Sequence, residues 1–271
     1  MNDHEEVADY YNANTEREWK RIERHPVEFE ITKRILEKYL PAAPAGIIDI
    51  GGGPGRYSFW LSKAGYEVSL LDLAQNCIDF AKEESKRQNV KIRDFMVGNV
   101  LELDNLVQDR VFDVALLMGP MYHLTAEEDR VTAIRKTLGK LKKNGLIVVS
   151  FISAYAPVLD ALKYNPEELR GNVARYAEYL DKGVNVVTAE NPGFTSAYFV
   201  NPARVDEFMS QFNVEKLGLY TAESILGPFE KQLLDVDKQI FDSCIELGMK
   251  FVEDDFCRAC GEHLLFVGKN R

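Results

Sequence analysis

The sequence has few cysteines, no excess of basic residues and no long apolar run. Four cysteines among 271 residues cannot build the disulfide framework of a small secreted protein. Lysine and arginine number 33 against 43 acidic residues, a net charge of -10, which disfavours a nucleic-acid partner because such partners need a basic surface. No segment is apolar for long enough to cross a bilayer, and the acidic N-terminus lacks the apolar core of a secretion signal. We therefore expect a cytoplasmic protein of enzyme size.

One stretch is unusual because an apolar run ends in a burst of glycines, over residues 47–57 (IIDIGGGPGRY). The pattern indicates a strand, a tight loop and a helix, which is typical of a nucleotide-binding turn. Glycine lets the backbone approach a ligand without a Cβ atom in the way. A dinucleotide fingerprint requires G-x-G-x-x-G, and Gly51 and Gly53 fit its first two positions, but Arg56 occupies the third. A nicotinamide or flavin cofactor is therefore disfavoured.

Strands and helices are predicted to alternate through the first half of the chain. The expected strands cover residues 46–50, 66–72, 90–96, 110–118 and 146–152. Short connections between such elements imply a parallel sheet with right-handed crossovers. The second half is less regular, with helices expected at 156–164, 166–181 and 202–212 and strands at 214–220 and 264–267. Residues 185–188 and 194–200 are possible short strands.

Two further segments flank or interrupt this alternation. Residues 7–40 are predicted to be helical, with a break near His25 and Pro26. They form either a solvated amphipathic helix or a lid that closes Tyr11 and a basic residue over a ligand. Residues 153–199 are longer than a crossover needs, so we expect part of them to cap the carboxyl edge of the sheet. Their aromatic side chains either wall an acceptor pocket or pack internally: Tyr155, Tyr164, Tyr176, Tyr179, Phe194, Tyr198 and Phe199.

The glycine loop resembles the first motif of the class I S-adenosylmethionine-dependent methyltransferases. The matching residues are Asp49, Gly51, Gly53 and Gly55 in the pattern D-x-G-x-G-x-G. Asp72, at the end of the second predicted strand, suits a ribose diol because a carboxylate accepts hydrogen bonds from both hydroxyls. On its own, such an aspartate is also a common helix N-cap.

The resemblance continues in the expected order along the chain. Asn99 and Val100 lie where the family places its adenine contact, although the family usually has aspartate in place of Asn99. Residues 112–120 resemble the fourth motif, and residues 141–146 resemble the turn that follows it. The fourth motif lacks the polar first residue of enzymes that methylate nucleobase amines, since Met118 stands there. A small-molecule acceptor is therefore favoured, and the narrower similarity is to bacterial methyltransferases of the small-molecule type.

The resemblance implies one methyltransferase domain over residues 1–271, with 1–40 as an N-terminal helical lid and 153–199 as a cap insertion. The expected fold is α/β and Rossmann-like, a seven-stranded sheet with helices on both faces and the last strand antiparallel. The implied cofactor is S-adenosyl-L-methionine, and the partner is a small-molecule acceptor, with neither nucleic acid nor membrane. The expected cofactor contacts are Tyr11, Asp49, Gly51, Gly53, Gly55, Asp72, Leu73, Asn99, Val100 and Met118.

Tyr122 and His123 follow the fourth predicted strand, at the sheet edge where ligands bind. We predict both as catalytic residues, with His123 as a general base because an unperturbed imidazole titrates near neutrality. The alternative is that His123 packs or bonds backbone ahead of the next helix. No metal site is expected, since Cys257 and Cys260 have the spacing of a zinc knuckle but no second pair accompanies them.

Two other functions stay open at the level of sequence. An NAD(P)-dependent Rossmann oxidoreductase would share the sheet and the acidic residue, although Arg56 disfavours it. A non-catalytic S-adenosylmethionine-binding protein is the second, because methyl displacement requires no obligatory catalytic side chain. The sequence determines neither the acceptor atom nor whether the chain forms a homodimer.

Overall fold

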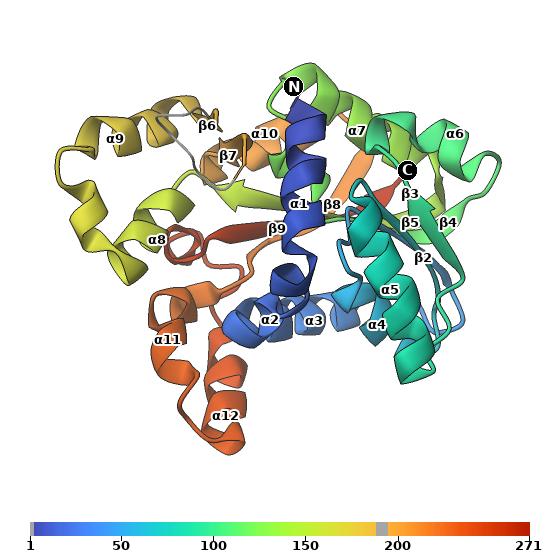
Figure 1. The fold of residues 1–271 in the computed structure, drawn as a ribbon, viewed down its shortest axis with the longest axis horizontal. Helices are drawn as coiled ribbons and strands as arrows, with labels where there is room; N and C mark the ends of the chain where they lie inside the picture. Colours follow the sequence, from blue (N-terminus) through green and yellow to red (C-terminus); the bar gives the residue numbers. More distant parts are fainter. Residues whose placement is uncertain (1–2, 188–194) are drawn as a thin grey trace.

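The structure is a computed structural model that describes residues 3–187 and 195–271. Helices precede the sheet, and strands then alternate with helices to the middle of the chain (Figure 1). The N-terminal elements are α1 (Asp3–Trp19), α2 (Arg21–Arg24) and α3 (Pro26–Tyr39). The alternating elements are β1 (Gly46–Ile50), α4 (Arg56–Lys63), β2 (Glu67–Asp72), α5 (Gln75–Gln88), β3 (Asp94–Val97), η1 (Val100–Glu102), α6 (Leu103–Val107), β4 (Phe112–Leu117), η2 (Pro120–Tyr122), α7 (Glu127–Gly139) and β5 (Leu141–Ser153).

The second half adds short helices and four strands. Its elements are α8 (Ala156–Tyr164), η3 (Pro166–Leu169), α9 (Val173–Lys182), β6 (Val184–Asn185), β7 (Ala197–Val200), η4 (Pro202–Arg204), α10 (Val205–Ser210), β8 (Val214–Thr221), η5 (Ser224–Phe229), α11 (Glu230–Leu233), α12 (Lys238–Gly248), η6 (Cys257–Cys260) and β9 (His263–Asn270). No helix among the described residues is both long and apolar enough to cross a membrane.

The sheet has the predicted α/β, Rossmann-like organisation. Strands β3, β2, β1, β4 and β5 are neighbours in that order, and every pairing among them is parallel. Strand β9 then pairs antiparallel with both β5 and β8. The last strand therefore runs antiparallel to β5, as predicted.

The strand count differs from the prediction, since the described residues form nine strands rather than seven. The two extra strands, β6 and β7, come from the segment expected to form a cap and pair antiparallel with each other. Strand β7 extends the sheet because Phe199 pairs with Ile152 near the end of β5, beyond the last residue of β4. Short strands of this kind are set by a long-range partner rather than by their own sequence.

Strand β5 also begins earlier than predicted. The expected turn at residues 141–146 lies inside it, and the strand starts at Leu141. Asn144 has a positive φ of 62°, and the register against β4 shifts between Phe112 and Val114. A β-bulge therefore accommodates the turn-forming residues without ending the strand.

Both faces of the sheet are covered, which explains the continuous apolar strands. Side chains of α3 such as Ile31 and Leu36 pack on one face with Ile47 of β1. Side chains of α7 and α10 pack on the other face with Ile48. In Figure 1, α1 crosses in front of the carboxyl edge of the sheet, between α8 and α9 on one side and α5 on the other. The crevice at this edge lies where the strand order reverses, between β1 and β4.

Candidate cofactor and acceptor site

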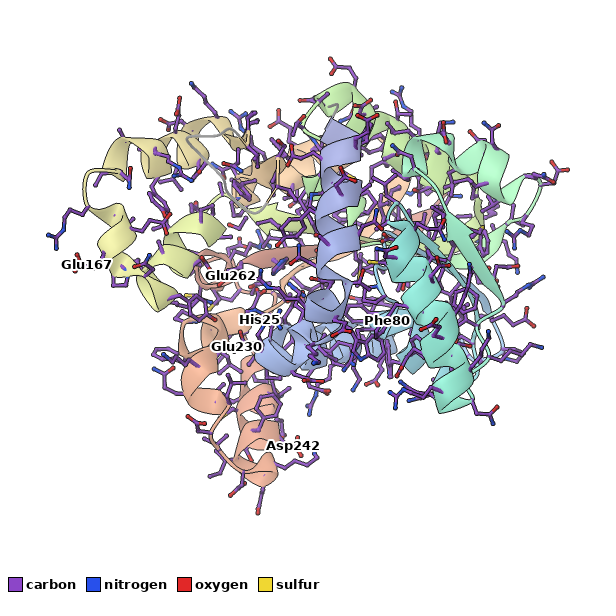
Figure 2. The ribbon with its side chains drawn as sticks, viewed as in Figure 1. His25, Phe80, Glu167, Glu230, Asp242 and Glu262 are labelled. Carbon is purple, nitrogen blue, oxygen red and sulfur yellow. The ribbon has the colours of Figure 1, made fainter. Side chains whose placement is uncertain are left out.

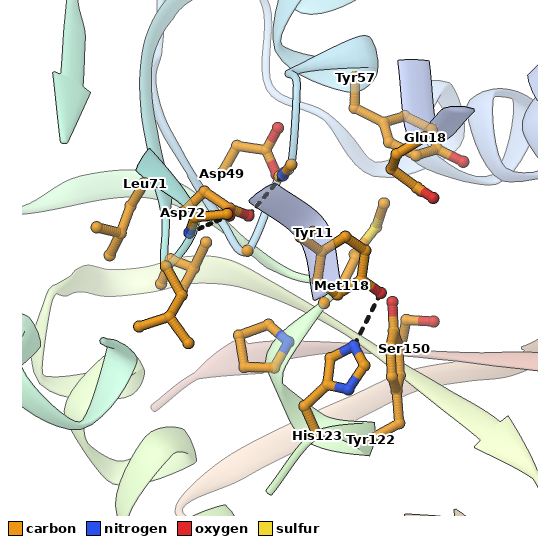
Figure 3. A pocket seen from close by; sticks show the side chains of 18 of the residues that line it. Tyr11, Glu18, Asp49, Tyr57, Leu71, Asp72, Met118, Tyr122, His123 and Ser150 are labelled. Carbon is orange, nitrogen blue, oxygen red and sulfur yellow. Dashed lines mark hydrogen bonds between the residues drawn. The ribbon is translucent and has the colours of Figure 1, made fainter. Parts of the chain in front are cut away.

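A cavity of about 200 Å³ lies at the carboxyl ends of β1, β2 and β4, beneath α1 (Figure 3). It brings together side chains that the sequence places far apart, from the N-terminal helix to the last strand. The predicted site residues that line it are Tyr11, Asp49, Gly51, Gly53, Asp72, Leu73, Asn99, Val100, Met118, Tyr122 and His123. Gly55 is the predicted contact that does not line this cavity.

The glycines of the loop have different structural roles. A Cβ atom on Gly51 would lie 2.5 Å from Pro120 Cδ, so this glycine lets the loop pack against the segment after β4. Gly53 has a φ of 55°, and a Cβ there would meet only Glu18 Cγ, at 3.8 Å, so its open side faces the cavity. Gly55 instead caps α4 with a φ of 88° and lies close to Leu70 of β2. Its place in the motif therefore reflects packing between helix and sheet.

Asp72 joins the glycine loop to the end of β2. Its carboxylate accepts hydrogen bonds from the backbone N–H of Gly53, at 2.7 Å, and of Ala74, at 2.8 Å. The hydroxyl of Ser58 donates to the neighbouring Asp49, at 2.6 Å. Burial raises the pKa of each carboxyl to about 6, against the opposing effect of these hydrogen bonds. Both carboxyls lie at one end of the cavity. They are mostly ionised at neutral pH, but their pKa values of about 6 lie close below it.

The segment after β3 lines the cavity beside Asp72, since the N–H of Gly98 donates to the carbonyl of Asp72 at 3.0 Å. The Oδ1 atom of Asn99 accepts from the N–H of Leu101, at 2.9 Å, because Asn99 caps the short helix η1. An amide oxygen has a second lone pair, so this cap still leaves it one acceptor position. Val100 is the first residue of η1, where a backbone N–H has no partner within its own helix. The wall therefore presents an acceptor and a donor side by side.

Tyr11 of α1 contacts the segment after β4 across the cavity. Its hydroxyl lies 2.9 Å from Nε2 of His123, and Figure 3 shows this contact bridging the two elements. Nδ1 of His123 in turn lies 3.2 Å from the hydroxyl of Thr195. The carboxylate of Glu6 accepts from the N–H and hydroxyl of Ser196, at 2.8 and 2.7 Å. Hydrogen bonds to the insertion and to the loop after β4 therefore hold helix α1 over the cavity.

His123 is neutral in this setting. It is buried, and burial lowers its pKa to about 4, although a hydrogen bond to the backbone of Ser196 opposes this shift. The ring of Tyr122 lies edge-on to it, with 4.7 Å between the ring centroids. Both ring nitrogens have hydrogen-bonding neighbours, so accepting a proton from a substrate would require Tyr11 to move away from Nε2. The predicted role as general base stays a prediction.

Four charged residues at the side of the cavity were missed by sequence reasoning. The guanidinium of Arg21 donates to both carboxylate oxygens of Glu28, at 3.2 and 2.6 Å. Nδ1 of His263 lies 2.6 Å from Oε1 of Glu223, whose other oxygen accepts from the backbone N–H of Glu262 and of His263. Because Arg21 and His263 lie 242 positions apart, nothing in their local sequence indicated that they meet.

The residues of this network set one another's protonation states. Burial opposes ionisation of Glu28, but Arg21 and His263 lower its pKa to about 2. Burial likewise opposes protonation of His263, but Glu28 and Glu223 raise its pKa to about 9. Glu28, Glu223 and His263 have ligand atoms within 4.8 Å of one another, as a metal site would. The guanidinium already neutralises Glu28, which favours an ion-pair network over a metal centre.

A second cavity, of about 440 Å³, adjoins the first and shares Glu18, Arg21, Glu28, Ile152 and His263 with it. It lies between the N-terminal helices and the insertion. Figure 2 places His25, Glu230 and Glu262 close together in this region. Its aromatic lining residues are Tyr10, Tyr176, Tyr179 and Phe199. Three of the seven aromatic side chains predicted to wall an acceptor pocket therefore line it, while Phe194 lies outside the described residues.

Cys257 and Cys260 do not contribute to either cavity. The four thiols are free, and Cys257 and Cys260 lie in η6, outside both cavities. His263, the histidine nearest to them in sequence, bonds Glu223.

Comparison with known proteins agrees with this geometry. A family described as a methyltransferase domain matches residues 47–145, which contain the glycine loop, Asp72, Asn99 and His123. The ubiquinone biosynthesis O-methyltransferase of Rickettsia felis is 26% identical over 130 residues, 48% of this chain and 50% of that protein. The chain thus spans about half the length of this curated relative.

Solved structures extend the likeness to the whole fold. Magnesium protoporphyrin IX methyltransferase from Synechocystis PCC 6803, crystallised with S-adenosylhomocysteine, covers 100% of both chains with a TM-score of 0.59 at 12% identity. A [4+2]-cyclase has a TM-score of 0.55 at 14% identity, over 89% of this chain and 79% of that one. The predicted resemblance to class I S-adenosylmethionine-dependent methyltransferases is confirmed. The cyclase shows that the fold by itself does not determine the reaction.

Proposed function

We propose that this chain is an S-adenosylmethionine-dependent methyltransferase that acts on a small molecule. One observation carries the proposal: the open side of Gly53 and the carboxylate of Asp72 face one cavity that Tyr11 closes from above. The residues present fit the cofactor. A Cβ on Gly53 would protrude into the cavity, and the carboxyl of Asp72 is held in place by two backbone donors.

The chain's own residues have distinct proposed tasks in binding. Asp72 accepts hydrogen bonds from the ribose hydroxyls, and Asn99 with the N–H of Val100 recognises the adenine edge. Gly51 and Gly53 allow the backbone to approach the methionine portion. When bound, the cofactor supplies a sulfonium methyl group already activated for in-line displacement. The protein's main contribution is therefore to align the acceptor and exclude water.

The acceptor side is formed by Met118, Tyr122 and His123, with Tyr11 above them. If Tyr11 moves away, Nε2 of the neutral His123 can accept a proton from an acceptor hydroxyl or amine. Residues 1–40 serve as the lid in this proposal, and residues 153–199 as the cap, since their side chains enclose the second cavity. The cytoplasmic location stays a prediction from the sequence.

Calorimetry separates this proposal from its rivals. The purified chain should bind S-adenosylmethionine and S-adenosylhomocysteine but not NAD(P), and the reverse result would refute it. A non-catalytic binding protein would bind the cofactor without turnover. Release of S-adenosylhomocysteine across a panel of small hydroxyl, carboxyl, amine and thiol acceptors decides between that protein and an enzyme.

A further inference from the structure

Arg21 and His263 face each other where the two cavities meet. Nη2 of Arg21 lies 3.4 Å from Nε2 of His263, and both side chains line both cavities. Nδ1 of His263 is committed to Glu223, at 2.6 Å, so the ring cannot turn its other nitrogen away without losing that bond. The two groups are therefore held with Nε2 of His263 pointing at Nη2 of Arg21, which also donates to Oε2 of Glu28 at 2.6 Å.

When His263 is protonated, this contact is not a satisfied hydrogen bond. A guanidinium only donates, and an imidazolium donates from both ring nitrogens. The carboxylates of Glu28 and Glu223 keep His263 protonated by raising its pKa to about 9. Glu28 accepts one N–H of Nη2, and the other N–H of this group then faces the N–H of Nε2, with 3.4 Å between the two nitrogens. An oxygen lone pair placed between them would satisfy both.

The site is accessible to a small molecule from the cavities. The side chains of Arg21 and His263 are 26% and 13% exposed, so both donors can be reached. Aromatic rings of Tyr10, Tyr176 and Phe199 line the adjoining cavity and suit a planar or apolar body.

We propose that Arg21 and His263 bind an anionic oxygen, from a carboxylate or a phenolate, of the methyl acceptor. This inference rests on the proposed function and names the acceptor class for that site. Glu18, Asp160 and Glu168 also line the second cavity, so a second negative charge on the ligand would be repelled. The expected acceptor is a monoanion with a planar or apolar body.

Benzoate is the probe that tests the site. It is titrated calorimetrically into the protein with and without S-adenosylhomocysteine, beside benzamide as its neutral counterpart and benzylamine as its cationic one. We expect benzoate to bind at least about tenfold more tightly than either, as a charge-assisted contact should. A parallel titration with 4-nitrophenolate under mildly alkaline conditions distinguishes a phenolate site from one that accepts only carboxylates.

The test variant is Arg21→Gln combined with Glu28→Gln, which removes the cation without leaving a buried carboxylate unpaired. Benzoate affinity should fall about tenfold to a hundredfold, and His263→Gln should lower it in the same direction. The matched control is Arg110→Gln with Asp94→Asn, an Arg–carboxylate pair at 2.5 Å that lies outside both cavities. Thermal unfolding of each variant checks that it is folded.

The outcomes separate this inference from the proposed function. If the parent binds S-adenosylhomocysteine but binds benzoate no better than benzamide, the anion site is refuted and the proposed function stands. Benzoate affinity unchanged in both Arg21 and His263 variants refutes the anion site as well. Failure of the parent to bind S-adenosylhomocysteine refutes the proposed function, while the titration without it still tests the anion site. A requirement for a divalent cation, abolished by a chelator, would also overturn the proposal by assigning Glu28, Glu223 and His263 to a metal.

Discussion

Replacing Asp72 with asparagine isolates the charge of one carboxylate at nearly constant shape. In the parent, both carboxylate oxygens accept backbone hydrogen bonds, from Gly53 and from Ala74. An asparagine offers one oxygen and one NH2 group, so one of these N–H donors would face another donor. The glycine loop would lose one of its two attachments to this side chain, and the ribose hydroxyls would lose a charged acceptor.

The size of the effect follows from the bonds involved. A hydrogen bond to a charged group contributes about 1.5–3 kcal/mol, and an unsatisfied buried donor costs about 1–3 kcal/mol. Either loss alone corresponds to roughly a tenfold to hundredfold change in affinity at about 1.4 kcal/mol per decade. We therefore expect Asp72→Asn to weaken S-adenosylmethionine binding by more than about tenfold, and Asp72→Ala to weaken it at least as much.

The affinity for the cofactor should change with pH in one direction. Hydroxyl donors favour the ionised carboxylate, and the pKa of Asp72 is raised by burial to about 6. Parent affinity should therefore fall as pH drops below about 6 and level off above it. The Asp72→Asn variant should show a weaker dependence, arising from Asp49, whose pKa is also about 6.

Calorimetric titration with S-adenosylhomocysteine across this pH range provides the assay, since no turnover intervenes. Asp113→Asn is a matched control, because Asp113 also accepts a backbone hydrogen bond from a strand of the same sheet, from Gly46 at 2.9 Å, but lies outside both cavities. It should leave affinity unchanged. Equal affinity of parent and Asp72→Asn, with both proteins folded, would remove Asp72 from the site.

Three further predictions concern the lid, the histidine beneath it and the ion-pair network. Tyr11→Phe should speed release of S-adenosylhomocysteine roughly twofold to tenfold in stopped-flow measurements, because the 2.9 Å contact with His123 is lost; an unchanged rate would argue against a lid. His123→Ala should slow methyl transfer while cofactor affinity stays within about twofold, and equal turnover would remove the base role. His263, with its pKa raised from 6.5 to about 9, stabilises the fold fully below pH 6.5, so that the unfolding free energy should fall by up to about 3 kcal/mol as pH rises to about 9. Urea unfolding of the parent should show this fall and His263→Gln should lack it; equal stability of the parent at both pH values would contradict it.

The residues proposed to bind the cofactor, apart from Tyr11 of α1, could be grouped from the sequence because each lies within a few residues of a strand end. Gly53 and Asn99 follow β1 and β3, Asp72 ends β2, and parallel strands bring their carboxyl ends to one edge. The spacing of apolar runs and glycines is therefore enough to place them together. The roles of Gly55 and of the Asn99 side chain were less accessible, since both depend on local packing and capping.

The acceptor side could not be predicted in the same way. Arg21 belongs to a short helix with an ordinary charged pattern, and its partners become apparent only once β9 has paired with β5 and placed His263 opposite Ile152. The possible short strands predicted at 185–188 and 194–200 overlap β6 and β7, whose register is set by long-range pairing. Sequence reasoning missed the meeting of Arg21 with His263, because the two residues lie far apart along the chain.

The two halves of the site are connected through the N-terminal helices. Tyr11 closes the cofactor cavity from α1, and Arg21 of the adjoining α2 forms one side of the proposed anion site. A movement of α1 that frees His123 therefore also disturbs the side chains around Arg21, because only Lys20 separates the two helices. Contacts to the acceptor would then favour the closed position of α1, in which the cofactor cavity is covered. Acceptor recognition and exclusion of water from the reacting groups thus depend on the same segment. A single closing motion of this segment would position the acceptor and exclude water at the same time, and methyl displacement requires both.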